Sequence, residues 1–562
     1  MEKGEDMNTI RWKMPDQYLT EWYRNLSGAV KTAFYAAFAA GLAAHLYQFT
    51  NKLYNYDELA NTPGGIGLST EQGRWLLNWM GRFMRSVFGG SYSLPFFNGI
   101  FALLFLALSA GMVVSVFQVR NKLTAGLIGG LMTVFPAVVS MYFFMFLALY
   151  YAIGIFFSVF AAWLTVKYPK NIIANIAAVV MIACSLGVYQ AYFPDTVCIL
   201  LIVVILKAAF GGVKEKKEWK EFFLMIARFL VVMAAGVAVY FLINKAVLAV
   251  THIQLTSYQG GDTMGKITIA QLISALKSCY TSFFDLGFSN VMGISYNRTV
   301  RRLIKVVWIL FAAGIGAYLV LKKKEYLNKV IVLCGILVFP VAMFLIYVMA
   351  PNSYCYTLMA YSVVFFFVFF LLWLDACFRN LKLHAPVKSI TNWVSALLTA
   401  ALVIVYIWYA NGNYMALEYT KYHDFSYVQT LITKIRSVED YSQDKPVIVV
   451  GTQINDSTNG MGSLIGDTFT VGGKADTNLG YNSLLYLMSD YLGFSPYYGT
   501  YEEIQNWMQR EVVREMPSYP ADGSIQVVKS VINSRSDCQL GLWIQSLYCL
   551  CQYMGSSVAD GS

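Results

Sequence analysis

Residues 94–122 have the sequence LPFFNGIFALLFLALSAGMVVSVFQVRNK, an apolar run that ends in two basic residues. The run from Leu94 to Val119 carries no charged side chain. It is long enough to cross the hydrocarbon core of a bilayer, which takes roughly 20 residues of helix. Arg120 and Lys122 follow at once, as basic residues do at the cytoplasmic end of a span. This stretch therefore predicts a transmembrane helix that ends in the cytoplasm.

The rest of the chain repeats this pattern. Of its 562 residues 57% are hydrophobic and only 13% are charged, whereas soluble domains carry about 25% charged residues. Hydropathy predicts about eleven transmembrane helices, and so an all-α polytopic membrane protein. The predicted helices begin near Gly28, Leu94, Ala125, Tyr142, Ile172, Thr196, Phe222, Leu303, Val330, Thr357 and Val394.

Lysine and arginine occur mainly before the first predicted span and in every second connection after it. This one-sided distribution favours a cytoplasmic N-terminus, because basic residues remain on the cytoplasmic side. It also accounts for the net charge of +10 without a nucleic-acid partner. On this topology, segments 51–93 and 251–302 lie outside the cytoplasm, and so does the chain after residue 410.

Two domains are expected. Residues 1–410 form the multi-span part, and the more polar residues 411–562 form a small extracellular mixed α/β domain. The second domain is indicated by the helical pattern FSYVQTLITKIRSVEDY, which is followed by the strand-like KPVIVVG. The last thirty or so residues fit such a domain poorly. The polar N-terminus, followed by a full-length apolar run, predicts no cleavable signal peptide.

Several enzyme and pump classes are disfavoured. The four histidines show no metal-ligand spacing, and no CxxC pair occurs among the nine cysteines, so a zinc enzyme is not expected. The sequence also contains no GxxxxGK[ST] loop, which argues against an ATP-driven pump.

The segment NYDELANTPGGIGLSTEQGRWLLNWMGRFMRSVFGG, residues 55–90, places two adjacent acids on the predicted outer side. A carboxylate there can act as general base toward a hydroxyl group. Asp57 and Glu58 could also bind Mg²⁺ or Mn²⁺ through their oxygens. The alternative, which composition alone favours, is a pair of ordinary solvated acids in a loop.

A helical pattern follows Thr70. Arg74, Asn78, Arg82 and Arg85 recur on one face, and tryptophans cover much of the rest, as in helices that lie at a membrane interface. Arg74, nearest the two acids, is predicted to help bind an anionic headgroup. The alternative is a membrane anchor without a ligand.

A tight turn, SLGVYQAYFPDTV, is predicted between the fifth and sixth spans. Tyr189, Gln190 and Asp195 place polar groups in this otherwise apolar hairpin, on the outer side. The alternative is plain turn chemistry, for which Pro194 and Asp195 are ordinary residues.

A basic cluster, YNRTVRRLIK, lies on the outer side, against the positive-inside trend. Its arginines are Arg298, Arg301 and Arg302. Because arginine binds phosphate with two parallel hydrogen bonds, the cluster suggests a phosphate ligand at the interface. Binding to ordinary anionic lipid heads explains it equally well.

The motifs YDE at 56–58, GRW at 73–75, GVYQAYFPD at 187–195 and MPSYPADGSIQVV at 516–528 together resemble the bacterial Gtr-type membrane glucosyltransferases. The resemblance extends over most of the chain, to about Val528, and the plan is similar to that of the GT-C superfamily. It implies a GT-C-type hexosyltransferase of the bacterial inner membrane. Such an enzyme takes a glucosyl residue from a polyprenyl-phosphate carrier and adds it, outside the membrane, to a cell-surface polysaccharide such as O-antigen.

The resemblance also implies roles for the residues above. Asp57 and Glu58 occupy the position of the family's acidic pair and would be catalytic. The donor phosphate would be bound by Arg74, Arg298, Arg301 and Arg302. Residues that would bind the acceptor or support the site are Trp75, Tyr189, Gln190 and Asp195.

The expected partners are the lipid-linked donor, the polysaccharide acceptor, membrane lipid, a small flippase and a polyprenyl-phosphate glucosyl synthase. No cofactor is certain, and Mg²⁺ or Mn²⁺ is the one left open. Two other classes also remain open. A transporter or flippase would more naturally place ionisable residues in mid-membrane, and a polysaccharide polymerase or ligase would use similar lipid-linked substrates.

Overall fold

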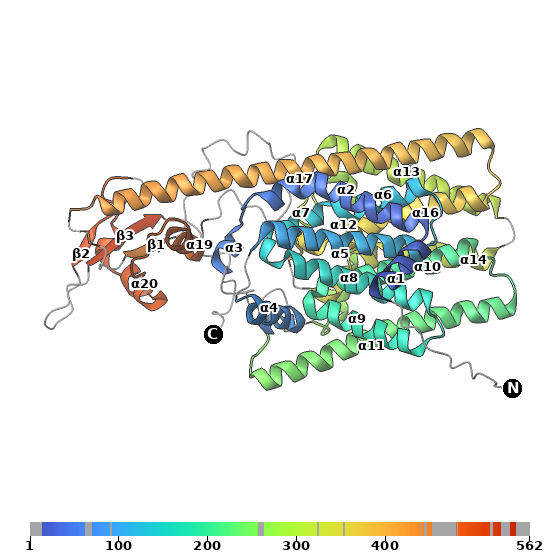
Figure 1. Cartoon of the computed structure of the whole chain (residues 1–562), viewed down its shortest axis with the longest axis horizontal. Coiled ribbons are helices and arrows are strands. Elements are labelled where there is room, and N and C mark those ends of the chain that lie inside the picture. Colours follow the sequence, from blue (N-terminus) through green and yellow to red (C-terminus); the bar gives the residue numbers. More distant parts are fainter. Residues whose placement is uncertain are drawn as a thin grey trace, which may run out of the picture.

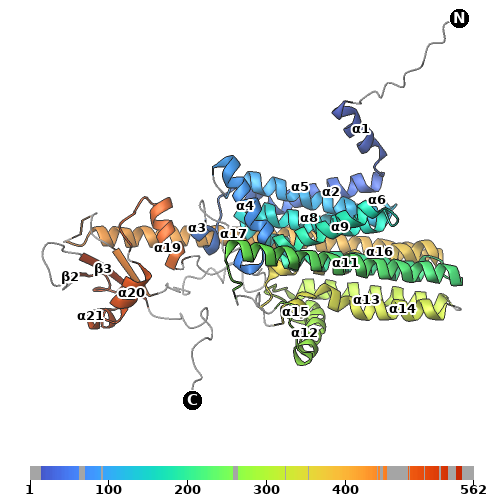
Figure 2. The same ribbon diagram turned by 90° about the horizontal axis from the view of Figure 1, so that it is seen from below.

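A computed structural model describes residues 14–61, 70–89, 93–256, 264–322, 325–351, 354–439, 441–442, 447–451, 479, 481–498, 500–517, 521–529 and 540–546. A bundle of long helices makes up most of the molecule, and a smaller unit lies beyond one end of it (Figure 1). A quarter turn shows the same two parts (Figure 2).

Each of the predicted apolar runs forms a helix. The apolar helices are α2 (Gly28–Thr50), α5 (Pro95–Val116), α6 (Lys122–Val134), α7 (Pro136–Phe143), α8 (Met145–Lys167), α9 (Ile172–Val188), α10 (Phe193–Phe210), α11 (Lys216–Thr251), α13 (Arg298–Leu321), α14 (Tyr326–Met343), α16 (Val364–Asn380) and α17 (Ala385–Arg436). Within the described residues, ten helical segments are long and apolar enough to cross a membrane. The predicted fifth span is α9, whose 17 residues fall just short of that length. The multi-pass helical fold is thus confirmed, with ten full-length spans rather than eleven.

One span is broken. Pro136 begins α7 directly after Phe135, and the pair α6–α7 together crosses as Lys122–Phe143. Because proline has no backbone N–H, it suits the first position of a helix and interrupts one that would continue through it. Only Phe144 separates α7 from α8, so these two helices follow each other almost without a connection.

Shorter helices lie between and before the spans. They are α1 (Pro15–Asn25), α3 (Tyr56–Asn61), η1 (Thr70–Gln72), α4 (Trp75–Phe88), η2 (Gln190–Tyr192), α12 (Ile269–Phe288), α15 (Ile346–Met349), η4 (Thr357–Met359) and η5 (Tyr361–Val363). The described part of the predicted external segment 51–93 therefore contains α3, η1 and α4, and α12 occupies part of the predicted segment 251–302.

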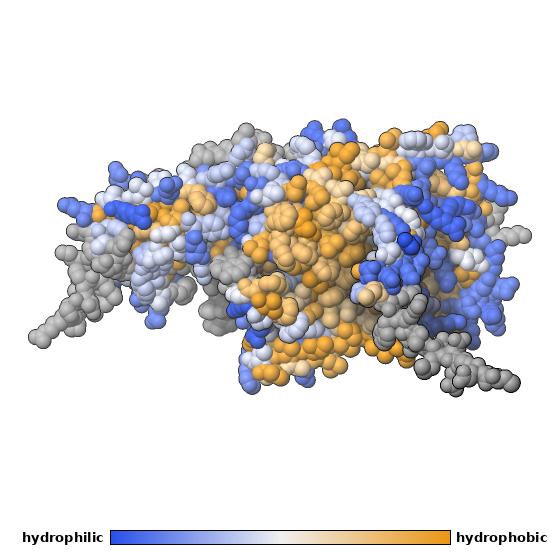
Figure 3. Space-filling model, viewed as in Figure 1, coloured by the Kyte–Doolittle hydropathy of each residue, from blue (hydrophilic) through white to orange (hydrophobic). Residues whose placement is uncertain are grey.

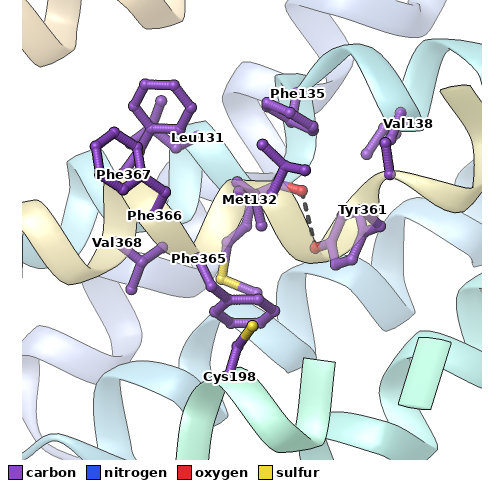
Figure 4. Close-up of a cluster of buried hydrophobic side chains, with 14 of the residues drawn as sticks. Leu131, Met132, Phe135, Val138, Cys198, Tyr361, Phe365, Phe366, Phe367 and Val368 are labelled. Atoms are coloured by element: carbon purple, nitrogen blue, oxygen red, sulfur yellow. Dashed lines mark hydrogen bonds between the residues drawn. The ribbon is translucent and has the colours of Figure 1, made fainter. Parts of the chain in front are cut away.

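The centre of the bundle is built around α16. Its run VFFFVFFLLW is buried on every side, as expected for a helix that is apolar all round. Phe365 and Phe367 pack among side chains of α6, α7 and α10, and the Tyr361 hydroxyl donates to the carbonyl of Met132 at 3.0 Å (Figure 4).

The surface of the bundle is apolar in its middle and hydrophilic toward both ends (Figure 3). Such a belt is the surface that a bilayer core covers. Successive spans run in opposite directions, so the basic connections after α5, α8, α10, α13 and α16 share one end of the bundle. The segments that hold α3 and α4 lie toward the other end (Figure 1).

The smaller unit follows α17, a single helix of 52 residues that continues through the predicted domain boundary at residue 410 to Arg436. Its elements are β1 (Val447–Gly451), α19 (Tyr481–Tyr486), η7 (Leu487–Tyr491), α20 (Tyr501–Met508), α21 (Glu511–Arg514), β2 (Val527–Lys529) and β3 (Leu540–Ser546). Residues 452–478, 530–539 and 547–562 of the predicted second domain lie outside the described residues.

The three strands form one sheet in the order β1-β3-β2. Strand β3 pairs parallel to β1, with Val449 opposite Ile544, and antiparallel to β2, with Val527 opposite Leu542. The central strand therefore comes from the last part of the chain.

The core of this unit reaches back to the N-terminal part of the chain. Tyr54 and Leu59, from the segment around α3, pack with Val428 and Leu431 of α17 and with Leu487 of η7. The segment that carries the two acids is consequently held between the helical bundle and the smaller unit.

Candidate active site

Helix α3 begins where Asn55 provides an N-cap. The Asn55 side-chain oxygen accepts a hydrogen bond from the backbone N–H of Glu58 at 2.9 Å, which satisfies one of the free donors of a first helical turn. The acids that sequence analysis placed in a loop therefore lie in the first turn of a short helix.

Glu58 is completely buried, so the alternative of an ordinary solvated acid does not hold for this residue. Lys52 Nζ lies 3.1 Å from Glu58 Oε1, and the Ser93 hydroxyl donates to the same oxygen. The backbone N–H of Met145 donates to Glu58 Oε2 at 3.2 Å. Met145 is the first residue of α8, so Glu58 caps that helix at the end where its dipole favours a negative charge.

Burial raises the pKa of Glu58, while the Lys52 charge, the Ser93 hydroxyl and the Met145 amide each act against that rise. Its two oxygens thus serve three buried or half-buried donors. This arrangement fits a residue that holds α3 against α8.

Asp57 occupies a different environment. It is only partly buried, and loss of solvent contact raises its pKa from the ordinary value to about 6. A carboxylate with that pKa is ionised at neutral pH and remains basic enough to take a proton in a transition state. Of the two adjacent acids, Asp57 is therefore the better candidate for a general base, and its catalytic role stays a prediction.

Arg74 precedes α4 rather than lying on its arginine face, which corrects the prediction. The chain reverses at Gly73, whose φ of +73° is in the left-handed region that favours glycine. The Arg74 guanidinium then lies over the Tyr189 ring, with Cζ 4.5 Å from the ring centroid. Arg82 and Arg85 are exposed on α4, as predicted for an interfacial helix.

The turn between α9 and α10 is buried, although the sequence suggested polar groups on an outward hairpin. Tyr189 is 3% exposed, Gln190 6% and Asp195 0%. Gln190 Nε2 donates to the carbonyl of Gln72 at 2.8 Å and to the Tyr240 hydroxyl at 3.0 Å. The turn is therefore attached to the segment that leads into α4.

Two of the quoted motifs meet at this point. The Tyr240 hydroxyl donates to the Gly73 carbonyl at 3.2 Å, so α11 also joins the contact. Trp75 packs on Gly187 so closely that a Cβ atom there would lie 2.6 Å from the indole ring. GRW and GVYQAYFPD, more than a hundred residues apart, thus form one structure.

The basic cluster at the start of α13 does not lie beside Arg74 and the turn between α9 and α10. Helix α13 packs on α12 and α16, whereas α4 packs on α9, and both views of the ribbon separate them (Figures 1 and 2). Arg298 and Arg302 are exposed. The Arg301 guanidinium donates to the carbonyl of Phe288 at 3.0 Å and to Asn290 Oδ1 at 2.9 Å. Arg301 therefore binds the end of α12, and a role at the donor phosphate stays a prediction.

In the described ranges, no three His, Cys, Asp or Glu side chains come close enough together to hold a metal ion. His45 is buried and hydrogen-bonds the Tyr414 hydroxyl and the Thr133 carbonyl, each at 2.8 Å. Binding of Mg²⁺ or Mn²⁺ by Asp57 and Glu58 stays a prediction.

Sequence reasoning missed the partners of these residues. Lys52, Ser93 and Tyr240 carry no motif signal, because each acts through a contact formed only by folding. Tyr491 of the smaller unit was missed too, although its ring centroid lies 5.7 Å from that of Tyr54, beside α3. The sequence offered one signal for Ser93. It is a polar residue directly before the predicted start of the second span at Leu94.

Comparison with known families gives one match. The family model of Glucosyl transferase GtrII matches residues 46–367, which is more than half of the chain. The matched range includes Asp57, Glu58, Arg74 and Asp195. A search of curated proteins found no match.

Proposed function

We propose a donor, an acceptor and a membrane side for this chain, which belongs to the glucosyl transferase GtrII family and is a membrane glycosyltransferase. The donor is a polyprenyl-phosphate-linked glucosyl residue. The acceptor is a hydroxyl group of a cell-surface polysaccharide, and transfer takes place on the extracytoplasmic face of the bacterial inner membrane.

One observation carries the proposal. The segment with Asp57 and the segment with Arg74 lie at the same end of the bundle, where the apolar belt gives way to hydrophilic surface (Figures 1 and 3). A lipid donor keeps its chain in the bilayer and its phosphate and sugar at this boundary. A half-buried carboxylate and an arginine are the groups that transfer from such a donor needs.

In the proposed reaction the acceptor oxygen attacks the anomeric carbon of the sugar, and Asp57 takes the hydroxyl proton. The bond from the anomeric carbon to the phosphate oxygen breaks, and polyprenyl phosphate leaves with the electron pair. Arg74 stabilises the negative charge of that phosphate. Direct displacement inverts the anomeric centre. Glu58 does not react but keeps α3 in place.

The membrane side rests on the basic connections. These share the end of the bundle opposite α3, and the positive-inside rule assigns that end to the cytoplasm. The smaller unit after α17 is then extracytoplasmic.

A labelling experiment tests this orientation. A cysteine placed at Tyr497, which is 54% exposed in the smaller unit, is expected to react with an impermeant maleimide in intact cells or spheroplasts. A cysteine at Tyr168, which is 45% exposed in the basic connection after α8, should react only after permeabilisation. The wild-type chain gives the background from native cysteines. The reverse pattern would place α3 in the cytoplasm and exclude a donor on the outer face.

A second experiment tests the phosphate contact. Arg74→Ala is expected to raise KM for the lipid donor by roughly 10- to 100-fold, because a hydrogen bond to a charged group contributes about 1.5–3 kcal/mol. Arg74→Lys should restore only part of the affinity, since lysine keeps the charge but cannot reproduce the flat contact with Tyr189.

Two matched variants control for other effects of removing an arginine. Arg82→Ala, on the exposed face of α4, should leave KM unchanged. Arg301→Ala should lower the unfolding temperature through loss of its contacts with the end of α12. If Arg74→Ala left the KM for the donor unchanged and Arg301→Ala raised it, the donor phosphate would have to bind at the start of α13 and not at Arg74.

A further inference from the structure

Asp195 is an unusual residue for the interior of a helical bundle. Its side chain is 0% exposed, and neither carboxylate oxygen accepts a hydrogen bond from any described residue. A fully buried carboxylate is normally paired or hydrogen-bonded, since burial without partners costs several kcal/mol. Asp195 therefore needs an explanation beyond packing.

The surroundings of Asp195 form a line of polar and aromatic groups. Tyr189, Tyr192 and Asp195 are spaced three residues apart through η2 into the first turn of α10, so they follow one side of this tight turn. The Tyr189 and Tyr192 ring centroids are 5.2 Å apart. Tyr151 of α8 lies against both, at 5.0 Å from Tyr189 and 6.1 Å from Tyr192.

The two ends of this line are the Arg74 guanidinium and the Asp195 carboxyl group. The Tyr192 hydroxyl is buried and makes no hydrogen bond with the described residues, and it lies within electrostatic range of both Asp195 and Arg74. Arg74 Nε is likewise buried without a hydrogen-bond partner among them. Exposure falls along the line from the half-buried Arg74 through Tyr189 and Tyr192 to Asp195.

We propose that Arg74, Tyr189, Tyr192 and Asp195 form the subsite for the glycosyl phosphate head of the donor. The phosphate binds at Arg74, the sugar ring lies against the tyrosine rings, and Asp195 accepts hydrogen bonds from the sugar hydroxyls. A carboxylate suits neighbouring hydroxyls because its two oxygens accept and do not donate when it is ionised. This assignment rests on the proposed function, whose donor is a lipid-linked sugar.

The position of the subsite agrees with the proposed base. Met145, whose amide binds Glu58, and Tyr151 lie on the same helix. Tyr151 is six positions after Met145, which is about 9 Å along the helix axis. A sugar ring against Tyr151 would therefore lie about 9 Å, along the axis of α8, from the residue that binds Glu58 of α3. Cys198, one turn further along α10, points into the core beside Phe365 (Figure 4) and takes no part in the subsite.

The test compares two lipids on the purified full-length chain in detergent. Polyprenyl phosphate and polyprenyl-phosphate glucose are titrated separately, and each Kd is taken from the ligand-dependent rise of the unfolding temperature. The wild-type chain should bind the glucose-bearing lipid more tightly. In Asp195→Leu that preference should fall about tenfold or more, as expected from loss of a charge-assisted hydrogen bond, while the Kd for polyprenyl phosphate stays the same.

Asp195→Asn is the second variant, and it replaces Asp195→Leu in this test if Asp195→Leu fails to fold. The asparagine side chain has the same shape as that of aspartate. Asp195→Asn should lose only part of the preference for the glucose-bearing lipid. Asparagine keeps one acceptor oxygen and replaces the other with an NH₂ group that cannot accept a hydrogen bond. Cys198→Ala, one turn further along α10, should keep the full preference. An unchanged preference in Asp195→Asn would overturn the subsite and make Asp195 a structural residue. So would a wild-type chain that binds both lipids equally.

Transfer of glucose to a glycan, measured on the same samples, separates this inference from the proposed function. A chain that transfers glucose but keeps its preference in Asp195→Asn would refute the subsite alone. A chain that shows the Asp195-dependent preference but transfers nothing would refute the proposed reaction and leave the subsite standing.

Discussion

Asp57→Asn is expected to lower kcat at least about 100-fold, the lower range of general-base catalysis. The substitution keeps the shape of the side chain but removes the group that accepts the proton of the acceptor hydroxyl. Because Asp57 is only partly buried, the variant should fold and insert normally and keep its KM for the donor. The measurement is steady-state transfer of glucose in detergent, after thermal unfolding has shown that the protein is folded.

The pH profile gives the control. Burial raises the pKa of Asp57 to about 6, and the base acts only when deprotonated. The wild-type kcat should therefore rise with pH through about 6 and level off above it, whereas Asp57→Asn should lose this step. Wild-type rates in Asp57→Asn, or a wild-type profile without a step near 6, would assign the base elsewhere.

Glu58→Ala is expected to lower the stability of the chain more than any other change at α3. It leaves the buried Ser93 hydroxyl and the Met145 amide without their acceptor. Each buried group that loses its partner costs about 1–3 kcal/mol, and the ion pair with the partly exposed Lys52 adds less. Activity should fall as well, since α3 is no longer held against α8. The unfolding temperature in detergent gives the measurement.

Glu58→Gln is the matched variant. It keeps an oxygen that can accept from Ser93 or Met145, so its loss of stability and of kcat should be milder than that of Glu58→Ala. Asp57→Ala, one residue earlier, should change the unfolding temperature little. If Glu58→Gln lost about 100-fold or more in kcat while Asp57→Asn did not, the roles of the two acids would be reversed.

Much of the fold could be predicted because hydropathy alone determines where a chain crosses a bilayer. Each predicted start, from Gly28 to Val394, lies in or next to an apolar helix. Helix α9, with 17 residues, is shorter than the ten full-length spans because it ends at Val188, within the stretch where the sequence predicts a turn.

The candidate site could be predicted less well, because burial depends on contacts between distant segments. Asp57 and Glu58 are neighbours in sequence, yet only Glu58 is enclosed, by Ser93 and by the start of α8. The helical pattern included Arg74, whereas the left-handed turn at Gly73 places it before α4 and against Tyr189. A pattern of charged residues in the sequence shows which side chains could bind a ligand, but it does not show which distant segment buries them in the folded chain.

The most direct test of the proposed reaction is the mass of its product. The purified chain in detergent is incubated with polyprenyl-phosphate glucose and candidate cell-surface glycans, with and without a chelator, and the glycans are analysed by mass spectrometry. We predict a glycan heavier by a single hexosyl residue and the matching release of polyprenyl phosphate, both lost in Asp57→Asn. Glycans extended by whole repeat units would indicate a polymerase. Unchanged masses of both lipid and glycan, from a folded chain that binds the donor, would contradict the assignment.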